Sequence, residues 1–255
     1  LRISRWCRSV GREAEALQVM TQAFVLDPLD PSVTNEYATL LWTAGRLAEA
    51  RRSFERNRAR WPGLDYVVVN PLLIAAWSED WSWADAQETE LRRHGPDNAF
   101  VRQKLAHVER LRAGSGVAGE AALQTVRAAL ADTGTVPLLS VAEAAFLGRW
   151  EEAVEAVESA SFDHLAHPDG RLLEGDPGLH YVHALGARMP AASEARFLRL
   201  CARLGLCAFW ADTGRWPDRA TGREADFERA VRAAARAFEH SGTGRGMGHP
   251  SLLAP

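Results

Sequence analysis

The chain has 255 residues and a formal net charge of −3, with 30 basic and 33 acidic side chains. This balance gives no basic face for nucleic acid, and no apolar run reaches the ~18 residues of a membrane-spanning helix. The three cysteines, Cys7, Cys201 and Cys207, cannot all pair and lack metal-ligand spacing, which favours a reducing compartment.

The first 63 residues contain two copies of one pattern: a helix, a tight turn and a second helix. Equivalent positions lie 34 residues apart, namely Gly11 and Gly45 in the turns, Ala16 and Ala50 in the second helices, and Pro28 and Pro62 after them. A fixed period near 34 with a helix-turn-helix unit is typical of helical-repeat proteins. The first copy, 1–30, lacks its opening residues, so we expect a fragment whose N-terminal neighbour is missing.

Three further copies are predicted within 64–160. In the third, Ala86 takes the place of Ala50 at a spacing of 36. Its first helix is expected to begin close to Pro71, because a proline inside a helix costs about 3 kcal/mol. The fifth copy has its turn at Gly148.

The repeat pattern stops near residue 160. We predict that 161–218 forms an irregular connection followed by a helical cap, in which Trp216 packs near Phe197 and helps to cover the last repeat. Apolar residues then recur at helical spacing after a capping box, so 219–240 is predicted to be an extra amphipathic helix. The Gly- and Pro-rich segment 241–255 is predicted to be a disordered tail.

The paired helices resemble the tetratricopeptide repeat (TPR). The residues that carry the resemblance in the second copy are Ala38, Leu41, Gly45, Ala50, Phe54 and Pro62. The segment RFLRLCARLGLCAFWADTGRWPD also resembles the closing segment of bacterial TPR proteins, in which the array follows a winged-helix domain or a nucleotide cyclase. The resemblance implies an all-α fold. It would be a right-handed α-solenoid of TPR-like hairpins over 1–160, with about five repeats, the first truncated, and a degenerate helical C-terminal cap.

The same resemblance implies a function in protein–protein interaction rather than catalysis. The chain would be a scaffold, the C-terminal part of a bacterial signalling or transcription regulator, with a protein or peptide partner and no cofactor, metal or direct nucleic-acid contact. In the family the first helix of each repeat lines a concave groove. That places the following residues in the groove: Asn35, Thr39, Trp42, Ser78, Glu79, Leu138, Ala142 and Ala145. The expected location is cytoplasmic, with the extracytoplasmic part of a membrane-anchored regulator as the alternative.

Two other functions stay open. A metal-dependent hydrolase or transferase would use the His-rich segment 163–183, where four histidines form two H-x-x-H pairs: His164, His167, His180 and His183. Residues at i and i+3 share a helix face and suit a metal ion, but prolines and glycines interrupt the segment, so we favour solvated histidines. A stand-alone envelope assembly factor is the other alternative. The sequence contains none of the motifs G-x-S-x-G, H-E-x-x-H or G-x-x-x-x-G-K-[ST].

Overall fold

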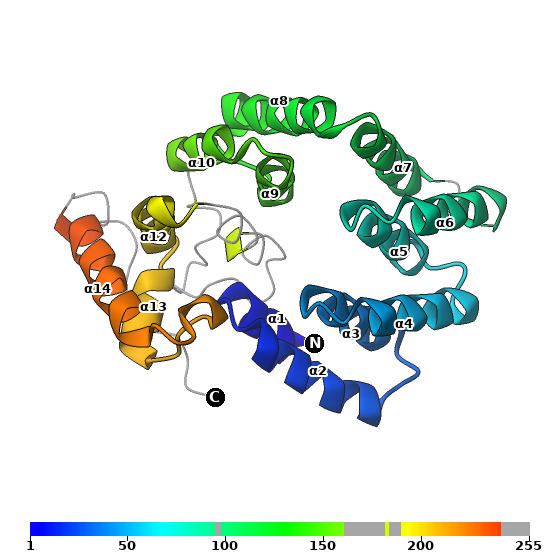
Figure 1. Ribbon diagram of the computed structural model, residues 1–255, viewed down its shortest axis with the longest axis horizontal. Coiled ribbons are helices and arrows are strands. Elements are labelled where there is room, and N and C mark those ends of the chain that lie inside the picture. The colour runs from blue at the N-terminus through cyan, green and yellow to red at the C-terminus, as the bar shows by residue number, and fades with distance from the viewer. Residues whose placement is uncertain (95–97, 161–181, 184–189, 241–255) are drawn as a thin grey trace. The chain divides into compact units, whose positions relative to one another are not determined.

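The computed structural model describes residues 1–94, 98–160, 182–183 and 190–240, and all regular structure within these ranges is helical (Figure 1). The α-helices are α1 (Arg2–Ser9), α2 (Glu13–Leu26), α3 (Pro31–Thr43), α4 (Leu47–Arg60), α5 (Asp65–Trp77), α6 (Trp81–His94), α7 (Ala99–Arg112), α8 (Ser115–Thr133), α9 (Leu138–Phe146), α10 (Trp150–Ser159), α12 (Glu194–Arg203), α13 (Leu206–Thr213) and α14 (Glu224–His240). Two short 3-10 helices, Ala191–Ser193 and Asp218–Ala220, complete the set. The predicted all-α class is confirmed.

The chain divides into two compact units. Unit 1 consists of Leu1, Ile3 and Glu13–Ala118, and unit 2 of Arg2, Ser4–Arg12 and Gly119–Pro255 so far as it is described. The division does not fall at the predicted limit near residue 160. Instead α1 belongs to the unit of the C-terminal helices, and α8 runs from one unit into the other. Unit 2 is therefore built from two separate stretches of the sequence.

In unit 1 each helix packs against the next along the chain from α2 to α6, and Figure 1 shows α3 beside α4 and α5 beside α6. Alternate helices also touch, because α3 contacts α5 and α5 contacts α7. The starts of α3 and α7 are capped by side chains. Asp30 Oδ1 accepts from the backbone N–H of Ser32 at 2.7 Å, and Asn98 Oδ1 accepts from that of Val101 at 2.9 Å.

A residue in the left-handed conformation recurs between consecutive helices at a spacing of 34 or 35 positions. These residues are Gly11 (φ 82°), Gly45 (75°), Glu79 (56°), Gly114 (118°) and Gly148 (87°). Glycine is favoured there because it has no Cβ to clash with the backbone. Glu79 is the non-glycine member of this series.

A buried alanine follows each of these turns in the next helix: Ala16, Ala50, Ala84, Ala118 and Ala153. The predicted equivalence of Ala86 with Ala50 is therefore wrong, since Ala86 is exposed and Ala84 is fully buried. Counting from Glu79 restores the common spacing. The spacing appears irregular in the sequence because no glycine marks this turn.

Pro71 lies inside α5 rather than near its start, which corrects the expected start of that helix. Proline removes one backbone N–H from the helix ladder. The neighbouring side chains are nevertheless deeply buried, among them Val67, Val69 and Leu72 at 0% exposure. Burial of this apolar helix offsets the local cost of the proline.

Unit 2 has a continuous apolar core. α9 packs on α10, and α12, α13 and α14 pack on one another. Its largest buried side chains are Trp210, Phe197, Phe209 and Phe227. Val10, directly after α1, is fully buried in this core, and the Trp6 ring of α1 meets the Phe209 ring edge-on at 5.6 Å.

Trp216 is half-buried against the same core, and its ring lies edge-on to that of Phe227 with centroids 6.3 Å apart. Phe227 belongs to α14, and Phe197 is buried in the same core with the guanidinium of Arg219 over its ring at 4.0 Å. Most of the predicted connection and the tail 241–255 lie outside the described residues. Within the described ranges, no helix has both the length and the apolar character that a bilayer span requires.

Candidate functional site

Four side chains from alternate helices form a continuous strip on unit 1, which we call the indole strip: Trp42, Ser78, Trp77 and His107. The rings of Trp42 and Trp77 stack with centroids 5.9 Å apart and planes 28° apart. Trp42 Nε1 donates to Ser78 Oγ at 3.0 Å, and Trp77 Nε1 donates to His107 Nε2 at 3.3 Å. The strip therefore links α3, α5 and α7 through both ring contacts and hydrogen bonds.

The opposite ends of the same three helices are also linked. The hydroxyls of Ser32 and Tyr66 lie 3.3 Å apart, and Asn98 Nδ2 donates to Asp65 Oδ2 at 2.6 Å. These partners are 34 and 33 positions apart in the chain, close to the repeat period. Polar contacts at both ends thus hold the register of α3, α5 and α7, which positions the indoles.

The indole strip is partly accessible. Trp42 and Trp77 are half-buried, Ser78 and its neighbour Glu79 are exposed, and His107 is buried. Each indole N–H is already satisfied, so what the two tryptophans offer a ligand is ring surface. Half-exposed aromatic side chains with fixed orientation are the residue type that dominates protein recognition sites.

Of the other predicted groove residues, two lie on α3 with Trp42 and three lie on α9. Asn35 is buried, and Thr39 donates its hydroxyl to the Asn35 backbone carbonyl at 3.0 Å. Leu138, Ala142 and Ala145 belong to α9 in unit 2; Ala145 is buried in its core, and the side chains of the other two lie outside the described part. The structure therefore brings together Trp42 and Ser78, with Glu79 next in the chain.

Sequence reasoning did not place Trp77 and His107 in the site. Trp77 is the last residue of α5, directly before the turn, and His107 has no motif around it. The available signal was the repeat itself. Trp77 lies 35 positions after Trp42, one period further along, so the two side chains occupy corresponding places on helices that contact each other.

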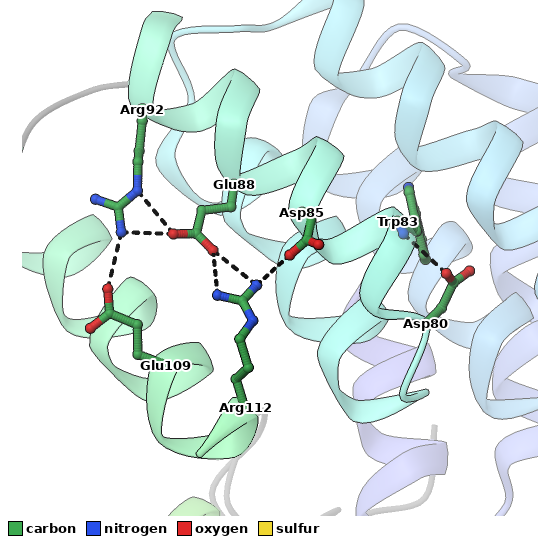
Figure 2. A network of polar contacts seen from close by, with 7 residues as sticks. All are labelled: Asp80, Trp83, Asp85, Glu88, Arg92, Glu109 and Arg112. Carbon is green, nitrogen blue, oxygen red and sulfur yellow. Dashed lines mark hydrogen bonds and ion pairs between the residues drawn. The ribbon is translucent and has the colours of Figure 1, made fainter. Parts of the chain in front are cut away.

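A network of ion pairs joins α6 to α7, as Figure 2 shows. Glu88 is its centre: Arg92 approaches one carboxylate oxygen at 2.7 Å, and Arg112 approaches the other at 3.1 Å. Arg112 also pairs with Asp85 at 2.6 Å, and Arg92 with Glu109 at 3.1 Å. Burial would raise the pKa of the Glu88 carboxyl, but the two arginines outweigh it and hold that pKa below its ordinary value.

Glu88 occupies a position that is apolar in the preceding copies. Met20 and Phe54, 68 and 34 positions earlier, are fully buried. The Glu88 side chain is only 14% exposed. It is stabilised at this position by ion pairs with Arg92 and Arg112 rather than by apolar packing. Both arginines in this network already have carboxylate partners. We therefore interpret the network as a structural link between α6 and α7.

A depression of about 360 Å³ on unit 1 is a second candidate for a site. It is lined by Arg58, Ala59, Pro62, Val68, Gln87, Glu90 and Leu91. The Arg58 guanidinium is held by the Gln87 side-chain oxygen at 2.7 Å. Because the Arg58 guanidinium is already hydrogen-bonded and few polar groups point into this depression, it is the weaker candidate for a ligand site.

The described residues contain no group of three or more His, Cys, Asp or Glu side chains placed to hold a metal ion. Of the two H-x-x-H pairs, only His183 lies within the described ranges. Its Nε2 is 3.0 Å from the Ser9 carbonyl oxygen. Since a carbonyl only accepts, this nitrogen carries the proton and donates the hydrogen bond.

Comparisons of the chain with protein-family models, with curated proteins and with solved structures gave no match.

Proposed function

We propose that unit 1 is a protein-interaction module that binds an extended segment of a partner protein across the indole strip. The observation that carries this proposal is the stacked pair Trp42 and Trp77, half-exposed and held by hydrogen bonds to Ser78 and His107. Fixed rings lose little conformational entropy on binding, which favours their use as anchors.

We further propose that the helices form an α-solenoid of TPR type. Support comes from the left-handed residue that recurs every 34 or 35 positions and from the buried alanine after each turn. In such arrays the first helices of successive repeats line one face, and α3, α5 and α7 are the helices that carry the strip. The resemblance of the closing segment supports a place within a bacterial signalling or transcription regulator in the cytoplasm.

To test the proposal, peptides that bind the full chain are first selected from a library of random short peptides. The affinity of each selected peptide is then measured for the unaltered chain and for the double variant Trp42→Ala/Trp77→Ala. We expect the selected peptides to lose at least tenfold in affinity. The matched control is Trp61→Ala, which removes an indole between α4 and α5, away from the strip residues in sequence. Peptides that bind the double variant as well as the unaltered chain would refute the proposal, provided circular dichroism shows that the variant is folded.

A further inference from the structure

The backbone of Glu79 is in the left-handed conformation, which is unfavourable for a residue with a Cβ. Its φ is 56°, and the other turns of the same series carry glycine. At Gly45 and Gly148 an added Cβ would meet nothing within 4 Å, so glycine is used there for its backbone freedom alone. A glycine at 79 would relieve the same strain. The glutamate therefore lowers stability at this position.

Nothing inside the described part of the chain compensates for that strain. Glu79 is exposed, and its carboxylate has no ion pair or side-chain hydrogen bond among the described residues. Other glutamates near the turns are engaged: Glu49 pairs with Arg46 at 2.6 Å, and Glu152 pairs with Arg149 at 2.6 Å. A strained residue with an unused charge points to a role outside the fold.

The residues immediately before Glu79 belong to the indole strip. Ser78 holds the indole of Trp42, and Trp77 stacks on that indole. The residue that carries the unpaired carboxylate is thus next in the chain to Ser78 and two positions after the half-exposed Trp77. This combination suits a cation, because ring faces attract positive charge and a carboxylate forms charge-assisted hydrogen bonds with it.

The chain itself places an arginine over most of its other described indoles. The pairs are Arg51 over Trp83 at 5.1 Å, Arg60 over Trp61 at 5.6 Å, Arg112 over Trp81 at 5.7 Å and Arg215 over Trp6 at 5.7 Å. Among the described residues no cation stands over Trp42 or Trp77. Trp42 and Trp77 lack the guanidinium that these four indoles have.

We propose that Trp42, Trp77 and Glu79 bind the guanidinium of an arginine side chain presented by the partner protein. The planar guanidinium stacks on an indole and directs its N–H groups at the Glu79 carboxylate. Arginine is a better fit than lysine because the ammonium group of lysine offers charge without the flat, stacking surface. This inference rests on the proposed interaction function of the indole strip and defines the chemistry of the partner.

The test uses the full chain and two blocked tripeptides, acetyl-Gly-Arg-Gly-amide and the same peptide with citrulline, which is isosteric with arginine but uncharged. Binding is followed by NMR from the indole N–H signals of Trp42 and Trp77, assigned by single Trp→Phe variants. We expect the arginine peptide to shift both signals and the citrulline peptide to shift neither. Equal shifts with the two peptides, or none with either, would overturn the arginine assignment.

Three variants separate charge from backbone strain. Glu79→Gln should weaken arginine-peptide binding roughly three- to tenfold without changing Tm. Glu79→Gly should weaken binding as much and raise Tm by roughly 2–8 °C. Asp132→Asn, at an exposed acid in α8 of unit 2, is the control and should change neither quantity.

Unchanged affinity in Glu79→Gln would refute the role of the carboxylate. The proposed function is judged separately, by the dependence of library-selected peptides on Trp42 and Trp77. If those peptides need the indoles but bind equally well with and without arginine, the interaction site stands and the arginine inference fails.

Discussion

Trp210 donates a hydrogen bond from its indole Nε1 to the backbone carbonyl of Val10, 200 positions earlier, at 3.0 Å. The two neighbouring carbonyls are also satisfied from the distant end of the chain. His183 donates to the Ser9 carbonyl at 3.0 Å, and the Asp218 backbone N–H donates to the Gly11 carbonyl at 2.9 Å. The last carbonyls of a helix have no partner within it. At Ser9, the last residue of α1, and in the turn that follows it, residues from the C-terminal part of unit 2 take that role.

Trp210→Phe should lower the free energy of unfolding by about 1–3 kcal/mol, because it keeps most of the ring but leaves the buried Val10 carbonyl without its donor. The control is Trp83→Phe. The Trp83 indole N–H is buried without a hydrogen-bond partner, so replacing it removes no hydrogen bond. Urea denaturation of the two variants checks the difference. Equal losses would show that ring size, not the bond to Val10, sets the cost.

Gly11→Ala should be far more costly than Gly45→Ala. Both glycines have positive φ, 82° and 75°, so alanine is strained at either by about 1 kcal/mol. A Cβ on Gly11 would also lie 2.7 Å from His183 Cε1 and 2.8 Å from Pro217 Cβ, whereas a Cβ on Gly45 meets nothing within 4 Å. We expect a total loss of about 3 kcal/mol or more at Gly11. Similar melting temperatures for the two variants would contradict this packing.

Unit 2 should lose stability in mild acid because of His183. Burial lowers the pKa of its imidazole from 6.5 to about 4; the bond to Ser9 and the Asp218 carboxylate oppose this, while the Arg219 charge adds to it. Between pH 6.5 and about 4, the His183 imidazole is protonated in the unfolded chain and neutral in the folded chain. Stability is therefore full above pH 6.5 and falls as the pH drops toward 4.

The size of this acid effect should be about 1–2 kcal/mol, since the ring is half-buried rather than fully enclosed. Denaturation of the unaltered chain and of His183→Asn across this pH range gives the measurement. The variant should be less stable at neutral pH and show a shallower decline in acid. Parallel pH profiles would rule out His183 as the source.

Glu88→Gln should weaken unit 1 by about 1 kcal/mol, because it removes the charge that Arg92 and Arg112 share. The loss should be smaller at high salt, which screens the exposed parts of the network. Arg127→Gln is the control: its ion pair with Glu120 joins side chains 55% and 41% exposed, and a pair of this kind contributes little. A salt-independent loss at Glu88 would mean that packing, not charge, is responsible.

The helices and their period were predictable because apolar residues, turn glycines and small residues are local signals. The register of the third copy was not, because Glu79 stands where a glycine was expected and the spacing then pointed to Ala86. The association of α1 with unit 2 was also missed, since the bond from Trp210 to Val10 leaves no local pattern. For the candidate site, Trp42 and Ser78 were expected from the resemblance to the repeat family, while Trp77 and His107 needed the contacts between helices.

The register itself can be tested by overpacking. Ala50 and Ala84 are 1% and 0% exposed and lie one period apart, so tryptophan at either position has no room. We expect Ala50→Trp and Ala84→Trp each to lower the free energy of unfolding by about 1–3 kcal/mol or more. Ala86→Trp is the matched control two positions away on the same helix, where the side chain is exposed and the substitution should cost under about 0.5 kcal/mol. Thermal melts of the three variants decide between the registers. If Ala86→Trp is the damaging change and Ala84→Trp is tolerated, the spacing of 36 read from the sequence is right and the structural register of α6 is wrong.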